Sequence, residues 1–223
     1  MKRKRATISS AALLVAWLAG ASPAGAQDAT PPVPVRLTFV THAAFFSQAT
    51  HRAPVIDPQI FIRQETLPEG TGPQNIEHVA GERPAQIDDV PELPAYDARG
   101  KSLGFSLGRW FGATGTVVLK RLDTGGERIE AAFSNLLPFG TYSLFRIAFT
   151  PAGAVFTPLD GAGTSNSFTV GAEGGAKLAV VTNQPLGSGD AIVLVYHSDG
   201  LTHGDSRGEL GLTAHQQLIV RLP

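Results

Sequence analysis

The sequence predicts an all-β protein in which antiparallel strands form a β-sandwich. Twenty of its 25 glycines lie at or after Gly100, where they separate short runs rich in β-branched and aromatic residues. The segment Glu127–Phe133 alternates cleanly, with Ile129 and Phe133 on one face and charged residues on the other, as a half-buried strand requires. No segment of this half shows a sustained helical period. Because the connections are too short for helical crossovers, we expect antiparallel pairing.

The individual strands follow from these short apolar runs. We expect them at Val35–Val40, Gln59–Ile62, Thr114–Arg121, Glu127–Phe133, Thr141–Phe149, Asn166–Val170, Lys177–Thr182, Asp190–His197 and Gln216–Leu222. Asp123–Gly126 is predicted as a turn, since glycine readily adopts the positive φ of tight hairpins. Asp190–His197 is apolar on both faces and is predicted to be a central strand covered on both sides. In the last strand, we expect His215 to share a polar face with Gln217 and Arg221.

Proline divides the chain into two parts of different composition. Residues 27–99 contain ten of the 16 prolines, and proline fixes φ and removes a backbone donor, which disfavours long central strands. We therefore predict three parts: a signal peptide at 1–26, a proline-rich segment with short strands at 27–99, and a β-sandwich domain at 100–223. The composition leaves open whether residues 27–99 fold independently.

The first 26 residues have the order of an export signal. A positive cluster, Lys2–Arg5, precedes the apolar run Ala11–Ala19 and the small-residue segment Ala24-Gly25-Ala26, which is typical of a signal-peptidase site. The apolar run is far shorter than the roughly 20 residues of a membrane-spanning helix. We expect cleavage before Gln27 and an exported protein, either periplasmic or secreted.

Charge and cysteine content narrow the functional classes. Removal of residues 1–26 leaves 14 Lys and Arg against 19 Asp and Glu, a net charge of −5, without a basic cluster. The sequence therefore predicts no nucleic-acid partner and no membrane insertion after cleavage. The chain has no cysteine, so disulfides, thiol chemistry and a lipidated N-terminal cysteine are excluded.

A leucine-proline corner precedes one of the expected strands. Asn135-Leu136-Leu137-Pro138-Phe139-Gly140-Thr141-Tyr142 resembles the L-x-P-G-x-Y corner of transthyretin-like and other exported β-sandwich domains, with Phe139 inserted between the proline and the glycine. The resemblance implies a β-sandwich in the style of immunoglobulin-like or transthyretin-like folds. It also implies that the hydroxyl of Tyr142 anchors the corner.

Three of the six histidines fall in a glycine-rich stretch between the last two expected strands. Imidazole and carboxylate groups brought together by such a loop can bind Zn²⁺ or Cu²⁺. The candidate ligands are His197, Asp199, His203 and His215, with Asp205 and Glu209 in reserve. His42 and His51 are further candidates from the other half. The alternative is that His197 is a hydrogen-bonded histidine at the rim of the core and that Asp199 and Asp205 only form turns.

The sequence of this loop also resembles a known motif. Thr202-His203-Gly204 followed by Arg207-Gly208-Glu209-Leu210-Gly211 resembles the zinc loop of Cu/Zn superoxide dismutases. The chain lacks the His-x-His copper motif and the cysteines of that family, and Gly208 stands where the second loop histidine belongs. The sequence therefore does not predict a dismutase.

No catalytic machinery is evident in the sequence. The chain contains no G-x-S-x-G nucleophile elbow, and no glycine cluster opens a helix that could cradle phosphate. The leading expectation is an exported, non-enzymatic β-sandwich that acts as a binding or structural module for an unknown protein or small ligand. The alternative is an exported Zn²⁺- or Cu²⁺-binding protein that uses the 197–215 loop.

Overall fold

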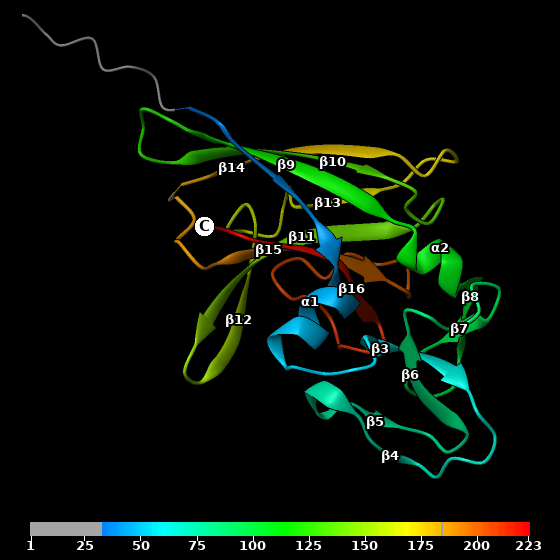
Figure 1. Cartoon of the computed structure of the whole chain (residues 1–223). Coiled ribbons are helices and arrows are strands. Elements are labelled where there is room, and N and C mark those ends of the chain that lie inside the picture. The colour runs from blue at the N-terminus through cyan, green and yellow to red at the C-terminus, as the bar shows by residue number, and fades with distance from the viewer. Residues whose placement is uncertain (1–32, 184) are drawn as a thin grey trace, which may run out of the picture. The chain divides into compact units, whose positions relative to one another are not determined.

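The computed structural model describes residues 33–183 and 185–223, and it confirms an all-β, sandwich-like fold (Figure 1). The predicted signal peptide and its cleavage site lie outside the described residues. All pairings between the strands are antiparallel. In the described part of the chain, no helix combines the length and the hydropathy needed to span a bilayer.

Two larger sheets hold most of the strands. The four-stranded sheet has the order β1 (Val35–Thr38), β9 (Thr114–Arg121), β10 (Glu127–Ser134) and β14 (Ala176–Thr182). The six-stranded sheet runs β12 (Gly153–Pro158), β11 (Thr141–Thr150), β15 (Ala191–His197), β16 (Ala214–Arg221) and β2 (Val40–Thr41), and β13 (Ser167–Thr169) also pairs with β11.

Two smaller sheets are formed by the proline-rich segment together with β8, which follows it. One has the order β6 (Glu82–Gln86), β3 (Ile56–Arg63), β7 (Pro94–Tyr96) and β8 (Ser102–Ser106), and the other pairs β4 (Gly70–Thr71) with β5 (Glu77–His78). β3 is longer than its proline suggests. It tolerates Pro58 because its pairing with β6 is irregular between Asp57 and Phe61, so the missing donor does not interrupt a regular ladder.

Strands from before Gly100 also complete the two larger sheets. β1 pairs with β9, and β2 pairs with β16. Residues 33–183 and 185–223 accordingly belong to one compact unit. The proline-rich segment therefore contributes edge strands to the sheets formed by the later part of the chain.

The main core lies between the two larger sheets. Ile129 and Phe133 of β10 belong to the same buried cluster as Leu144 of β11 and Ile192 and Leu194 of β15. The opposite face of β15 is also covered, since Val193 and Val195 are buried in a second cluster against Phe45 of α1 (His42–Ala49). The prediction that this strand is central and apolar on both faces is confirmed.

The corner before β11 is held by its tyrosine, as predicted. The Tyr142 side chain is fully buried, and its hydroxyl oxygen accepts a hydrogen bond from the backbone N–H of Leu137 at 3.1 Å. Burial raises the pKa of Tyr142 above its usual value, so the hydroxyl stays protonated. Phe139, at the tip of the corner, has a φ of 59° and is 73 % exposed.

Two α-helices, one 3-10 turn and the six strands β4 to β8 and β12 were not predicted. α1 begins after Thr41, whose hydroxyl accepts a hydrogen bond from Ala44 N at 3.3 Å, a regular N-cap. α2 (Leu107–Phe111) has only five residues, and η1 (Pro73–Asn75) is a 3-10 turn. Such short helices show too few turns for a period to be recognised. β12 was missed because it is a short edge strand that ends at Pro158.

The core assignment is tested by replacing Phe133 with alanine. Phe133 is 4 % exposed, and its ring lies 5.2 Å from that of Phe39 and 6.0 Å from that of Phe168. We expect Phe133→Ala to lower the free energy of unfolding by about 3–5 kcal/mol, because it leaves a cavity between the sheets. Urea denaturation provides the measurement. The control, Val181→Ala at a half-exposed site, should cost less than about 0.5 kcal/mol, and equal effects would contradict the assignment.

Candidate metal site

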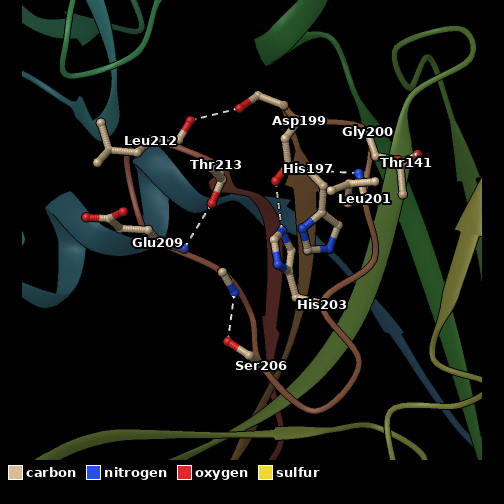
Figure 2. Close-up of polar contacts among 12 residues, drawn as sticks. Thr141, His197, Asp199, Gly200, Leu201, His203, Ser206, Glu209, Leu212 and Thr213 are labelled. Atoms are coloured by element: carbon tan, nitrogen blue, oxygen red, sulfur yellow. Dashed lines mark hydrogen bonds and ion pairs between the residues drawn. The ribbon is translucent and has the colours of Figure 1, made fainter.

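Three of the four predicted ligands come together at one end of β15. His197, Asp199 and His203 each offer a ligand atom, and these atoms lie within 4.8 Å of one another. His197 is the last residue of β15, whereas Asp199 and His203 lie on the loop that leads to β16 (Figure 2). We call these three side chains the 197–203 cluster. Within residues 33–183 and 185–223, it is the one grouping of three or more such side chains.

His197 is the buried member of the cluster. It is 1 % exposed, and its Nε2 lies 2.8 Å from the hydroxyl oxygen of Ser143 on β11. Its Nδ1 is buried and has no hydrogen-bond partner. The ring faces that of His203, with 5.3 Å between the ring centroids (Figure 2). Because Ser143 occupies Nε2, Nδ1 is the nitrogen that His197 has free for a ligand.

Burial also keeps His197 neutral. Desolvation is the main cause that lowers its pKa to about 4, and the neighbouring His203 lowers it further, while the charge of Asp199 acts in the opposite sense. At neutral pH the imidazole therefore carries a free lone pair, which metal coordination requires. His197 needs no deprotonation before it can bind a metal ion.

Asp199 and His203 form the outer part of the cluster. Nε2 of His203 lies 3.0 Å from Oδ2 of Asp199, and the two side chains are 27 % and 25 % exposed. The other carboxylate oxygen of Asp199, Oδ1, accepts a hydrogen bond from Leu201 N at 3.1 Å. The carboxylate is thus fixed by its own loop and directed at His203, which leaves this side of the cluster open to solvent.

Hydrogen bonds pin the loop at both of its ends (Figure 2). The hydroxyl of Thr141 donates to Gly200 O at 3.2 Å, and the hydroxyl of Ser198 donates to Leu212 O at 2.8 Å. Gly208 has a φ of 80°, and a Cβ there would lie 3.3 Å from Cδ2 of His203. Glycine at this position therefore permits both the left-handed turn and the close approach of His203.

His215 lies outside the cluster. It is fully buried: its Nδ1 lies 3.1 Å from Gln59 O, and its Nε2 lies 3.3 Å from Ser198 Oγ. The expectation that His215 shares a polar face with Gln217 and Arg221 is wrong, because His215 and Gln217 are buried whereas Arg221 is exposed.

A bulge explains the orientation of His215. The register of β16 shifts at Gln217, because Leu194 pairs with Leu218 but Val195 pairs with Gln216. Paired residues of neighbouring strands point to the same face, so His215 follows its partner Tyr196. His197 continues the opposite face, which includes Val195.

The reserve candidates also lie elsewhere. Asp205 and Glu209 are exposed residues outside the 197–203 cluster. His42 begins α1 and is buried, and burial lowers its pKa to about 3. His51 is exposed just after the helix.

Ser143 was missed in the sequence. It is 3 % exposed between the buried residues Tyr142 and Leu144, and a small hydroxyl residue within a largely apolar strand was its only signal. Its partner His197 is distant in sequence, and the pairing of β11 with β15 brings the two together.

Two imidazoles and one carboxylate form a ligand set that suits Zn²⁺ or Cu²⁺. Metal–ligand distances of about 2.0–2.2 Å place ligand atoms roughly 3.3 Å apart in a tetrahedral site, so the 197–203 cluster has to contract on binding. Only loop side chains need to move, because Asp199 and His203 lie on the loop. Three protein ligands also leave a coordination position for water or another donor.

Comparison with family models, curated proteins and solved structures finds no match to this chain.

The role of His215 in the buried network can be measured through pH. Burial is the main cause that lowers its pKa to about 4 in the folded state, whereas a histidine in the unfolded chain titrates near 6.5. As the pH falls below about 6.5, the unfolded state therefore binds a proton first, and the contribution of His215 to stability is lost towards pH 4.

We expect His215→Gln to be less sensitive to acid than the wild type. The difference in unfolding free energy between the two proteins should shrink by about 2 kcal/mol from pH 7 to pH 5, measured by urea denaturation. Burial raises the pKa of Asp57 to about 6 and that of Glu82 to about 7, which acts in the opposite sense but is common to both proteins. A difference that does not change with pH would show that His215 is not held neutral.

Proposed function

We propose that the protein works outside the cytoplasm as a non-enzymatic β-sandwich module that binds Zn²⁺ or Cu²⁺ through the 197–203 cluster. Two observations carry this proposal: a ligand atom from each of His197, Asp199 and His203 lies within 4.8 Å of the others, and Nδ1 of His197 is buried without a partner. The proposal of export rests on the order of a positive cluster, an apolar run and small residues within the first 26 residues.

An unpartnered nitrogen in a buried position has an energetic cost. A buried polar atom without a hydrogen bond destabilises a protein by about 1–3 kcal/mol, and a bound cation removes that cost at Nδ1. A bound metal ion would also account for the closeness of the His197 and His203 imidazoles, since both would coordinate the same cation. The carboxylate of Asp199 supplies the negative charge that favours the ion.

The arrangement supports binding more directly than catalysis. His203 is hydrogen-bonded to Asp199, as in catalytic dyads. The hydroxyl of the buried Ser143, however, is hydrogen-bonded to His197 and not to His203, so His203 has no serine nucleophile to activate there. The sequence has no nucleophile elbow. A metal-binding or metal-handling role uses each of the three side chains, whereas a nucleophilic mechanism leaves their spacing unexplained.

Metal content decides between this proposal and a β-sandwich module that binds no metal. Exported protein purified without a histidine tag should contain zinc or copper at one equivalent per chain, measured by elemental analysis before and after dialysis against a chelator. Protein that has no metal, and takes up none when one equivalent of either ion is added, would contradict the proposal.

Metal should also raise the melting temperature, because an ion that binds only the folded state stabilises it. At a free metal concentration of about 100 times Kd, the stabilisation is about 2.7 kcal/mol. We expect His203→Ala to abolish this increment and to leave the metal-free protein nearly unchanged, since the side chain is partly exposed. Asp205→Asn, on the same loop but outside the cluster, serves as the matched control and should retain the increment.

Ser143 should act as a positioning residue for His197. If Nδ1 binds the metal, Nε2 carries the proton and donates it to the Ser143 hydroxyl, which fixes the tautomer and the ring. Loss of such a partner typically weakens metal affinity by about 10–100-fold, so Ser143→Ala should show this loss in calorimetric titration with Zn²⁺. Ser167→Ala, on the neighbouring strand β13, should bind like the wild type. Unchanged affinity in Ser143→Ala would rule out the positioning role.

A further inference from the structure

A hollow lies along the later part of the same loop. It has a volume of about 920 Å³ and is lined by residues 69–71, 74–79 and 98–99 and by Arg207, Glu209, Leu210 and Leu212. We call it the hairpin groove, because the β4–β5 hairpin forms one wall. Its volume is in the range of natural ligand sites. None of the three residues of the 197–203 cluster lines it.

The floor of the groove is apolar. Ile76, Ala98, Leu210 and Leu212 line it and pack together around the buried Phe61. Ala98 and Ile76 are buried, whereas Leu210 and Leu212 are partly exposed. The two leucines therefore offer a hydrophobic surface on which a ligand's aliphatic group can be removed from water.

The hairpin wall is held in place by its turn. Gln74 and Asn75 both have positive φ, 59° and 57°, which is costly for residues other than glycine. The side-chain oxygen of Gln74 accepts a hydrogen bond from Nε2 of the fully buried Gln59 at 2.7 Å. This contact ties the strained turn to the core, so the wall facing the groove is ordered before any ligand binds.

Arg207 is the residue whose bonding is incomplete. Its Nε is buried and has no partner, and its Nη1 makes one long contact of 3.4 Å to Gly208 O. The guanidinium lies over the Phe156 ring, with Cζ 4.4 Å from the ring centroid. Among the described residues, no carboxylate lies within ion-pair distance of it. Burial desolvates the guanidinium in part and thereby lowers the pKa of Arg207.

A carboxylate is the group that fits this guanidinium. Arginine presents a planar fork of donors that binds carboxylate in a bidentate manner and stacks on aromatic rings at the same time. The other wall has the opposite charge, with the exposed carboxylates of Glu69 and Glu77, and Glu209 adds a third acidic group at the rim. A polyanion is therefore disfavoured, and the complementary ligand carries one carboxylate and a separate positive charge.

We propose that the hairpin groove binds the C-terminal end of a peptide, with the terminal carboxylate on Arg207, the last side chain on the apolar floor, and a basic residue upstream facing Glu69 and Glu77. A peptide satisfies all three features, and its extended chain matches a groove of this volume. This site is independent of the metal proposal, since the two share no side chain.

The test uses the full mature chain in the presence of a chelator, titrated with acetyl-Lys-Ala-Ala-Leu and followed by NMR or calorimetry. The same peptide with a C-terminal amide is the matched ligand control. We expect saturable binding of the free acid and binding weaker by about tenfold or more for the amide, because the amide removes the charge-assisted bonds. Equal affinities, or no saturable binding by the free acid, would overturn the proposal.

Two variants and one small acid localise the effect. Arg207→Gln should bind acid and amide equally, whereas Arg99→Gln, an exposed arginine at the same groove, should keep most of the difference. If Arg207→Gln fails to fold, the comparison of acid with amide on the unaltered protein still decides the outcome. Binding of 4-methylpentanoate as tight as that of the peptide would mean that the occupant is a small organic acid, and the peptide proposal would be wrong.

Discussion

Burial of β15 on both faces is the constraint on which the rest of the structure depends. Ile192 and Leu194 fill the core between the two larger sheets, while Val193 and Val195 pack under α1 and β12. A strand covered on both sides has no wet face at which a polar side chain can rest. His197 continues this strand and is therefore desolvated, with only the Ser143 hydroxyl to satisfy one of its two nitrogens. The unusual state of this histidine is a consequence of its position in the sheet.

The chain's return from β15 to β16 determines what surrounds that histidine. The two strands are neighbours and antiparallel, so the loop between them has to fold back over the end of the sheet. Its early part presents Asp199 and His203 to His197, and its later part presents Arg207 and Leu212 to the hairpin groove. One connection thus supplies residues to two chemically different surfaces, one rich in imidazole and one built around a guanidinium.

Much of the fold could be predicted because the strands are amphipathic and bounded by glycine. Alternation is clean in β10, and the predicted strand there differs from the observed one by a single residue. The helix α1 could not be predicted, because its eight residues span too few turns for a helical period to stand out between two strands. In the candidate site, Asp199 and His203 were within reach of sequence reasoning since they are close in the chain. The contribution of Ser143 was not, because it depends on which strand pairs with β15.

The bulge at Gln217 determines which side of the sheet His215 faces. A strand alternates strictly between its two faces only while its register is unbroken, and a bulge places the residues before it on the face opposite to the one that alternation predicts. His215 faces Trp110 and Tyr196 for this reason. If the strand lost the bulge and kept all its residues, Gln217 would pair with Val195 and His215 with His197, so this histidine would turn to the face of His197. The gain or loss of a bulge is thus a change by which such a strand can gain or lose a ligand without any substitution of its histidines.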